Sequence, residues 1–305
     1  MKASGDQPYI FRSISELMRR LGQPAPLHPL IAVVGYKNMS VDLDPGIPFA
    51  LDFYKISFKM NFKGQVRYGQ GHYDFEAGGL AFIAPNQLIT AMQETYDHEG
   101  FMLFFHADLI RNYALGRLIG NYGFFSYAVS EALFLSDREK KIVAALFEAM
   151  EQELATNIDQ FSQDVLVSQI DLLLNYSNRF YNRQFITRKA VYNDLIHKMD
   201  AYLSLRFDTG QANLNNLPTV QEVSDHLGVS TRYLTDMLKS LTGQNTQQHI
   251  HARLIEKAKE ILSTSSLTVA EIAYRLGFEH PQSFNKLFRQ KANCSPVEFR
   301  RSFQR

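Results

Sequence analysis

Three features of the sequence predict an α+β protein with several domains. The chain has 305 residues, which is enough for about two domains. Short aromatic and β-branched runs separated by Gly and Pro turns fill its first third. From Leu133 onward, apolar residues recur at helical spacing, and a pattern of two helices joined at a glycine occurs twice near the C-terminus. We therefore expect a sheet domain, a helical segment and an all-helical domain, in that order.

Four stretches carry the strand pattern and place the sheet domain at residues 1–134. They are residues 51–61 (LDFYKISFKMN), 65–75 (QVRYGQGHYDF), 78–90 (GGLAFIAPNQLIT) and 100–106 (GFMLFFH). Several short strands joined by Gly and Pro turns are typical of a β-sandwich or a small barrel.

Residues 135–186 are expected to form two helices. Ser136 and Glu139 have the spacing of a capping box at the start of the first helix. The second begins near residue 164, and its apolar stripe consists of Val167, Ile170, Leu173, Leu174 and Tyr181. Leu172 falls outside that stripe. Two interpretations stay open: the helices form a dimer interface, or they only pack on the sheet domain.

After a polar loop at 210–218, the sequence repeats itself within an expected domain at 187–305. The two copies are joined by residues 246–263, which have helical spacing. Paired positions are Thr219 with Thr268, Glu222 with Glu271, Leu227 with Leu276, Gly228 with Gly277, Leu234 with Phe284, Leu238 with Phe288, and Gly243 with Asn293. A correspondence this long is unlikely to arise by chance.

Each copy predicts a helix-turn-helix unit, the first at 219–243 and the second at 268–292. Threonine with glutamate three residues later forms a capping box. Glycine then ends the first helix of each copy, because it adopts left-handed backbone at little cost. The connecting helix would be about 25 Å long at 1.5 Å per residue. Such a spacer could hold two helices about 34 Å apart, which is one turn of DNA.

Charge and cysteine content narrow the class of protein. Residues 187–305 carry 16 Lys and Arg against 11 Asp and Glu, whereas residues 1–186 carry 16 against 20. This division indicates a polyanionic partner for the C-terminal part, although an excess of this size is also ordinary. Cys294 is the only cysteine, which fits a reducing compartment. Neither a signal peptide nor a stretch of about 20 apolar residues is evident, so we expect a cytoplasmic protein without a membrane partner.

Residues 219–303 resemble the AraC/XylS-type DNA-binding domain. The motif is IAYRLGFEHPQSFNKLFRQKANCSPVEFR at residues 272–300. Asn293 stands where the family usually has glycine, and asparagine also tolerates the left-handed cap. The upstream part looks like the cupin-type regulatory half of many members. The resemblance thus implies a cupin-like β-barrel at 1–134, a dimerisation segment at 135–186 and a DNA-binding domain at 187–305.

The resemblance puts the helices after Gly228 and Gly277 in successive major grooves. Outward residues near their N-terminal ends can reach base edges, since Arg pairs with guanine and Gln or Asn with adenine. The expected base contacts are Thr231, Arg232, Thr235, Asp236, His280, Gln282, Ser283, Asn285 and Lys286. The expected phosphate contacts are Ser230, Lys239, Arg289 and Lys291. Asp236 either reads a cytosine amino group or pairs with Arg232, and the second interpretation is preferred.

The sheet domain lacks the ligand set of a catalytic cupin. Cupin enzymes bind their metal through a cluster of His and Glu side chains. The first strand motif offers only His72 and Glu76 of these two types, with no His-x-His pair, and no histidine follows Pro85 in the second motif. Catalytic metals usually have three or more protein ligands. His249 and His251 are two apart on a helix and face different sides. We therefore expect no metal, no other cofactor and no enzymatic activity.

A barrel without a metal can still bind a small molecule. Polar handles on the first two predicted strands, at 53–60 and 66–75, are Tyr54, Lys55, Lys59, Arg67, Tyr68 and Tyr73. Half of the alternating positions must face away from the interior. A basic or Tyr-lined cavity would favour an anionic or aromatic effector. The alternative is a barrel that only supports dimerisation and binds no ligand.

These observations predict a ligand-responsive, sequence-specific transcription regulator. Its expected partners are an operator in double-stranded DNA, a second copy of the chain, a small-molecule effector and RNA polymerase, with activation as the direction of control. The alternatives are a metal-dependent cupin enzyme fused to a DNA-binding tail, an effector-free dimeric regulator, and a module whose helix-turn-helix units bind protein.

Overall fold

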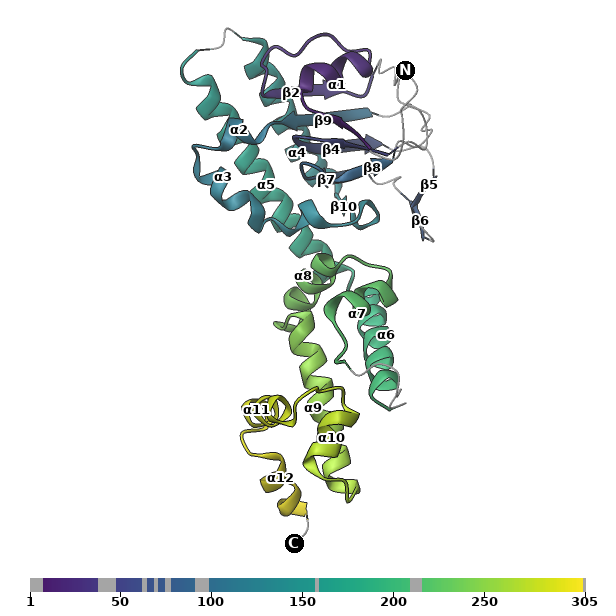
Figure 1. Cartoon of the computed structure of the whole chain (residues 1–305). Coiled ribbons are helices and arrows are strands. Elements are labelled where there is room, and N and C mark those ends of the chain that lie inside the picture. Colours follow the sequence, from purple (N-terminus) through teal and green to yellow (C-terminus); the bar gives the residue numbers. More distant parts are fainter. Residues whose placement is uncertain are drawn as a thin grey trace. The chain divides into compact units, whose positions relative to one another are not determined.

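Strands lie in the first unit of the chain and only helices in the described part of the second, in the computed structural model (Figure 1). The units are Met1–Gln184 and Phe185–Arg305. The structure describes residues 8–37, 48–61, 65–68, 71–74, 78–90, 99–156, 159–208 and 216–303.

The largest sheet has five strands, and each is antiparallel to its neighbours. In spatial order they are β10 (Leu133–Phe134), β7 (Gly79–Ile83), β4 (Tyr54–Asn61), β9 (Glu99–Phe105) and β2 (Ile31–Gly35). A second sheet contains β1 (Tyr9–Phe11), β3 (Pro48–Leu51) and β8 (Leu88–Thr90), with β1 parallel to β3. The strands β5 (Gln65–Tyr68) and β6 (Gly71–Asp74) pair with each other.

One face of the five-stranded sheet packs against the second sheet and helix α1 (Ile14–Arg20). The buried side chains between them include Phe11, Leu17, Met18, Leu51, Phe53, Met102 and Phe104. Burying side chains of this size is worth roughly 1.5–3 kcal/mol each, so this core holds the two sheets together.

The opposite face of the same sheet packs against helices. Phe147 of α4 (Asp137–Ala155) stacks on Phe58 and Phe101, with ring centroids 5.7 and 5.6 Å away. Helix α5 (Ser162–Thr187) adds Tyr181, whose ring stacks on Phe124. Short helical segments on this side are α2 (Ala107–Ile110), α3 (Ala114–Leu118), η1 (Ile119–Asn121), η2 (Gly123–Ser126) and η3 (Val129–Glu131).

The predicted sheet-rich first part is confirmed, but its described strands do not close into a barrel. The five-stranded sheet has β10 at one edge and β2 at the other. Side-chain packing, rather than strand pairing, joins it to the three-stranded sheet. Within the described strands, the arrangement is therefore that of two packed sheets, the sandwich form of the prediction.

The second unit is all-helical over the residues described. Its helices are α6 (Lys189–Asp208), α7 (Val220–Leu227), α8 (Thr231–Thr242), α9 (Thr246–Thr264), α10 (Val269–Arg275), α11 (Pro281–Ala292) and α12 (Pro296–Phe303). The predicted connecting helix is α9, which contacts α6, α8, α10, α11 and α12 (Figure 1). Arg253 and Lys257 of α9 form ion pairs with Asp200 and Asp208 of α6. Across the described chain, every helix is too short or too polar to cross a membrane.

Candidate nucleic-acid interface

The first helix-turn-helix unit forms as the capping pattern predicts. The Thr219 hydroxyl accepts a hydrogen bond from the Glu222 N–H, and the Glu222 carboxylate accepts one from the Thr219 N–H. Gly228 ends α7 with a φ of 68°, in left-handed backbone. Ser230 then caps α8 by accepting from the Tyr233 N–H. The sequence between two caps thus forces a sharp turn.

The second helix-turn-helix unit repeats this geometry with one tighter contact. Thr268 and Glu271 form the capping box of α10, and Gly277 has a φ of 92°. A Cβ atom at Gly277 would lie 2.9 Å from the carbonyl carbon of Asn216. Glycine is therefore needed here for both backbone conformation and space. Asn293 ends α11 in left-handed backbone, as its residue type predicts.

The apolar residues of α8 and α11, the helices predicted to read DNA and called the reading helices below, face inward. Leu234 and Leu238 of α8 are fully buried, as are Phe284 and Phe288 of α11. Phe284 packs on Phe278 at 5.4 Å between ring centroids, and Phe288 packs on Phe299 of α12 at 5.7 Å. These contacts fix the rotation of each helix about its axis and so decide which residues face solvent.

The outward residues of α11 and its N-cap are the predicted ones. His280, Gln282, Ser283, Asn285 and Lys286 are exposed, as are Arg289 and Lys291. In the major groove, Gln and Asn can both donate hydrogen bonds to base edges and accept them, and Lys can donate. Their contact with DNA stays a prediction.

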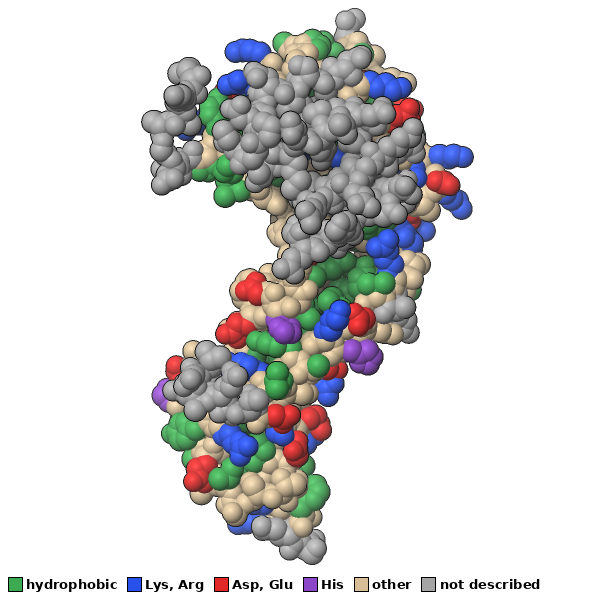
Figure 2. Space-filling model, turned by 90° about the vertical axis from the view of Figure 1, so that its right-hand side faces the viewer, with side chains coloured by type: hydrophobic (Ala, Val, Ile, Leu, Met, Phe, Trp, Pro, Cys, Tyr) green, Lys and Arg blue, Asp and Glu red, His purple; other side chains and the backbone are tan. Residues whose placement is uncertain are grey.

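The outward residues of α8 are already engaged within the chain. Arg232 donates from Nε to Asp236 Oδ2 at 3.0 Å, which is the pairing that the sequence favours for Asp236. Contact of either residue with a base stays a prediction. The Thr235 and Thr246 hydroxyls are 3.0 Å apart. Thr231 is half-buried and Lys239 is exposed. Figure 2 shows acidic and basic side chains interspersed on one face of the C-terminal unit.

Tyr233, whose role the sequence leaves open, packs inside the second unit. Its ring lies 5.4 Å from that of Phe185, and its hydroxyl oxygen lies 3.0 Å from that of Tyr192. Sequence reasoning missed this group, because its members come from three different helices. The available signal was the aromatic residue at the third position of α8, on the same side as Leu234 and Met237.

The predicted effector residues divide between two faces of the sheet. Tyr54 stacks on Phe105 at 4.9 Å, on the side of the helices, and burial raises the pKa of Tyr54. Lys55 lies opposite Phe104 in the register and therefore shares the face between the two sheets. Lys59 lies on the same face, with its ammonium 6.0 Å from the Tyr36 ring centre. Strands β5 and β6 place Arg67 opposite His72 and Tyr73 opposite Val66, and Tyr68 pairs with Gly71.

Metal ligation finds no support in the described residues. They contain no group of three His, Cys, Asp or Glu side chains that could hold a metal ion. Glu76 and the His72 side chain lie outside them. His249 Nε2 is 2.8 Å from the Thr242 hydroxyl and His251 Nε2 is 2.9 Å from Gln247 Nε2, and burial lowers the pKa of both histidines.

Two capped helix-turn-helix units on one connecting helix define a double helix-turn-helix domain. Residues 223–302 match the family model described as a helix-turn-helix domain. This match shows that the C-terminal part of the chain contains a helix-turn-helix domain, and the motif at 272–300 resembles that of the AraC/XylS type.

Relatives of the chain include the HTH-type transcriptional activator RhaS of Escherichia coli O1:K1 / APEC. It is 37% identical over 78 residues, which are 26% of this chain and 28% of RhaS. The chain thus aligns with little more than a quarter of the curated relatives it matches. RhaS is described as a transcriptional activator, and neither RhaS nor the family model indicates an enzyme family.

Two solved structures are similar at low identity. An AraC-type transcriptional regulator from Chromobacterium violaceum is 19% identical with a TM-score of 0.32, over 37% of this chain and 96% of that one. Unsaturated fatty acid bound ToxT from Vibrio cholerae strain SCE256 is 16% identical with a TM-score of 0.29, over 89% of this chain and 94% of that one.

Proposed function

We propose that the chain is a sequence-specific DNA-binding transcription regulator of the AraC/XylS type. The observation that carries this proposal is the pair of reading helices, each with its apolar face buried on a common scaffold and its polar face outward. The match of residues 223–302 to the helix-turn-helix model supports it. The similarity to an activator supports activation as the direction of control. RNA polymerase as a partner and the cytoplasm as the location are further parts of the proposal.

Selection of duplexes from a random pool by the full-length chain tests DNA recognition. We expect enrichment of one sequence, and an affinity for it that falls steeply with salt. Gln282→Ala and Lys286→Ala should each weaken binding to that duplex by about 1–3 kcal/mol, while thermal unfolding stays unchanged. Unchanged affinity in both variants would show that α11 does not read bases, and a pool without enrichment would refute sequence-specific binding.

The proposal includes a cupin-like N-terminal unit that binds a small effector. Lys55, Ser57 and Lys59 share the face between the two sheets, which favours an anionic or aromatic compound. A thermal-shift screen of anionic and aromatic metabolites should find a compound that raises the unfolding midpoint of the wild type more than that of Lys55→Met. If no compound stabilises the chain, the effector-free alternative is the better description.

We also propose that the chain forms a homodimer through α5. Phe161, directly before α5, and Val165 and Leu172 of α5 are exposed apolar residues on one side, and a second copy of the chain would cover them. Sedimentation should show a dimer for the wild type and a monomer for Leu172→Glu. Asn178→Glu, an exposed residue on another side of α5, is the matched control and should remain dimeric. A Leu172→Glu dimer would contradict this interface.

A further inference from the structure

The joint between α9 and α10 is bound by a side chain from a third helix of the compact unit Phe185–Arg305. Arg300 of α12 donates from Nε to the Leu262 carbonyl oxygen at 3.2 Å and from Nη2 to the Leu267 carbonyl oxygen at 2.6 Å. Leu262 lies in the last turn of α9, where carbonyl groups lack a partner in the helical pattern. Leu267 directly precedes Thr268, the N-cap of α10. One guanidinium group thus binds the end of one helix and the approach to the next.

Helix α12 is itself fixed to the reading helix α11. Phe299, next to Arg300, packs on the fully buried Phe288 of α11, with 5.7 Å between ring centroids. At the start of α12, the Ser295 N–H donates to the Glu298 carboxylate at 2.7 Å, and the Glu298 N–H donates to the Ser295 hydroxyl at 3.2 Å. Arg300 therefore connects α11, through α12, with the last turn of α9.

The other reading helix is attached to the opposite end of α9. The hydroxyl of Thr246, the first residue of α9, lies 3.0 Å from that of Thr235 in α8, and Thr246 is fully buried. The 19 residues of α9 span about 28 Å at 1.5 Å per residue. The position of α11 relative to α8 therefore depends on α9 as a spacer and on the joint that Arg300 binds.

The internal repeat indicates that a helix-turn-helix unit does not by itself require arginine at this position. Continuing the pairing of Gly243 with Asn293 pairs Ile250 with Arg300. Ile250 is 1% exposed, so the first copy fills the equivalent place with an apolar side chain. Arginine stands there in the copy that follows α9, and it binds the joint through which that copy is attached.

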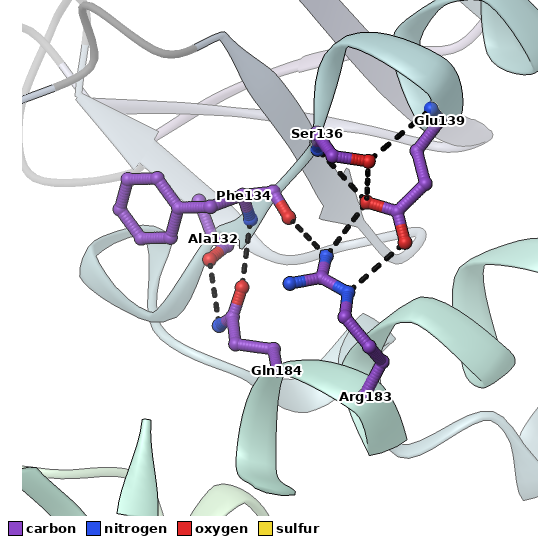
Figure 3. A network of polar contacts seen from close by, with 6 residues as sticks. All are labelled: Ala132, Phe134, Ser136, Glu139, Arg183 and Gln184. Atoms are coloured by element: carbon purple, nitrogen blue, oxygen red, sulfur yellow. Dashed lines mark hydrogen bonds and ion pairs between the residues drawn. The ribbon is translucent and has the colours of Figure 1, made fainter. Parts of the chain in front are cut away.

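Arg183 of α5 binds backbone in the same manner within the other compact unit, beside Gln184 (Figure 3). Its Nη2 donates to the Phe134 carbonyl oxygen at 2.7 Å, and the Gln184 Oε1 accepts from the Phe134 N–H at 2.8 Å. Arg183 also donates to both carboxylate oxygens of Glu139, each at 2.9 Å. Because this arginine lies outside the compact unit that contains both reading helices, it supplies a matched control for Arg300.

We propose that Arg300 is a positioning residue that fixes the spacing between the two reading helices, and hence the number of base pairs between the two sets of bases that they read. The proposal rests on the DNA-binding function proposed above. Charge-assisted hydrogen bonds to two carbonyl groups hold α10 and α11 in one direction relative to α9. Without the guanidinium group the joint can bend, and α11 can follow a set of bases that has moved by one base pair.

The test uses the full-length chain and the duplex that it selects from a random pool. Arg232→Ala identifies the bases read by α8, and Lys286→Ala identifies those read by α11, as the positions where base substitution no longer costs affinity. One base pair is then inserted or deleted between the two sets. Each such change moves one set by about 3.4 Å along the duplex and turns it by about 35°. The ratio of the affinities for the original and the shifted duplex is the spacing loss.

Three variants are compared with the wild type. Arg300→Met removes every donor and keeps an apolar stem, whereas Arg300→Lys keeps one ammonium group that can bind one of the two carbonyl oxygens. Arg183→Met is the control, since it removes the same group from a backbone carbonyl of the other compact unit. Thermal unfolding of each variant is measured alongside binding.

We expect a spacing loss of at least about tenfold for the wild type, comparable to that of a mismatched base pair. In Arg300→Met the spacing loss should fall to about threefold or less, because the original duplex is bound about three- to tenfold more weakly while the shifted duplex is not. Arg300→Lys should lie between the two, and it decides the question if Arg300→Met does not fold. Arg183→Met should keep the spacing loss of the wild type.

A purely structural role of Arg300 would lower the unfolding midpoint and leave the spacing loss at the wild-type value, which would overturn the proposal. An equal fall of the spacing loss in Arg183→Met would overturn it as well. If the selected duplex carries bases read by one helix only, DNA binding stands and the fixed spacing is refuted. If no duplex is enriched at all, the proposed function itself fails, and this inference fails with it.

Discussion

Gly228 and Gly277 hold equivalent places in the two helix-turn-helix units, yet their surroundings differ. Both have left-handed backbone, with φ of 68° and 92°. Among the residues that the structure describes, none has an atom within 4 Å of a Cβ built at Gly228, whereas a Cβ at Gly277 would meet the backbone of Asn216 and Leu217. The first glycine is needed only for conformation, and the second also for a close approach between two segments of the domain.

Replacing each glycine by alanine should separate these two requirements. Gly228→Ala is expected to cost about 1–2 kcal/mol of unfolding free energy, from left-handed backbone alone. Gly277→Ala should cost at least about 1 kcal/mol more, because backbone must move to make room. Denaturant unfolding of both variants measures the difference. Equal costs would mean that the contact with Asn216 is absent in solution.

Asp236 is the other residue whose surroundings make a specific prediction. Its ion pair with Arg232 is a half-exposed pair one helical turn apart, of a kind worth only about 0.3–0.5 kcal/mol. Asp236→Ala should therefore leave stability nearly unchanged. It should strengthen duplex binding and steepen the salt dependence, because α8 loses a negative charge that repels phosphates.

The matched control for Asp236 is Asp194, which pairs with Lys198 one turn away on α6. Asp194→Ala removes the same charge and the same type of pair outside the reading helices. Affinity measured from low to high salt should change for Asp236→Ala and remain at the wild-type value for Asp194→Ala. An equal gain in both would indicate a general charge effect and no special place for Asp236.

At the scale of elements, two helix caps make the stability of the compact unit Phe185–Arg305 sensitive to acid. The Glu271 carboxylate accepts hydrogen bonds from the Thr268 N–H and hydroxyl, which hold the pKa of Glu271 below its ordinary value. Ser295 lowers the pKa of Glu298 in the same way at α12. Each lowered pKa stabilises the fold above the pKa of the unfolded state. That stabilisation is lost as the pH falls through the folded-state pKa.

The unfolding midpoint of the chain should therefore fall as the pH is lowered from about 5, near the ordinary range of glutamate pKa values. In Glu271→Gln the neutral amide can still accept from Thr268, and the drop should be smaller. Thermal unfolding between pH 7 and pH 3 measures both curves. Glu256→Gln, at an exposed residue of α9, is the control and should follow the wild type. Parallel curves for all three proteins would contradict the role of the Glu271 cap.

Local elements could be predicted from the sequence, and contacts between distant elements could not. The features that could be predicted depend on residues a few positions apart. They are both capping boxes, the left-handed residues Gly228 and Asn293, and the inward face of α11. By contrast, Gln184 and Phe134 are 50 positions apart, and no periodicity links them. The pairing of Tyr192 with Tyr233 spans 41 positions. Strand pattern likewise indicated sheets but not how the sheets join, since that depends on long-range register.

At the scale of the whole molecule, the boundary between the two units falls inside a helix. Residues 184 and 185 both lie within α5, so no loop separates the last residue of one unit from the first of the next. The sequence predicts a DNA-binding domain that starts at 187, two residues further on. The predicted domain therefore leaves out Phe185, which packs on Tyr192 and Tyr233.

A C-terminal fragment that starts at the predicted boundary, residue 187, would therefore lack Phe185, which is part of its core. A fragment of residues 187–305 should bind a hydrophobic dye and melt at a lower temperature than one of residues 182–305, which keeps Phe185. Introducing Phe185→Ala into the longer fragment should reproduce the defect of the shorter one, and identical melting of the two fragments would contradict it. Where a helix is shared in this way, the shortest independently stable piece is longer than the motif that identifies it.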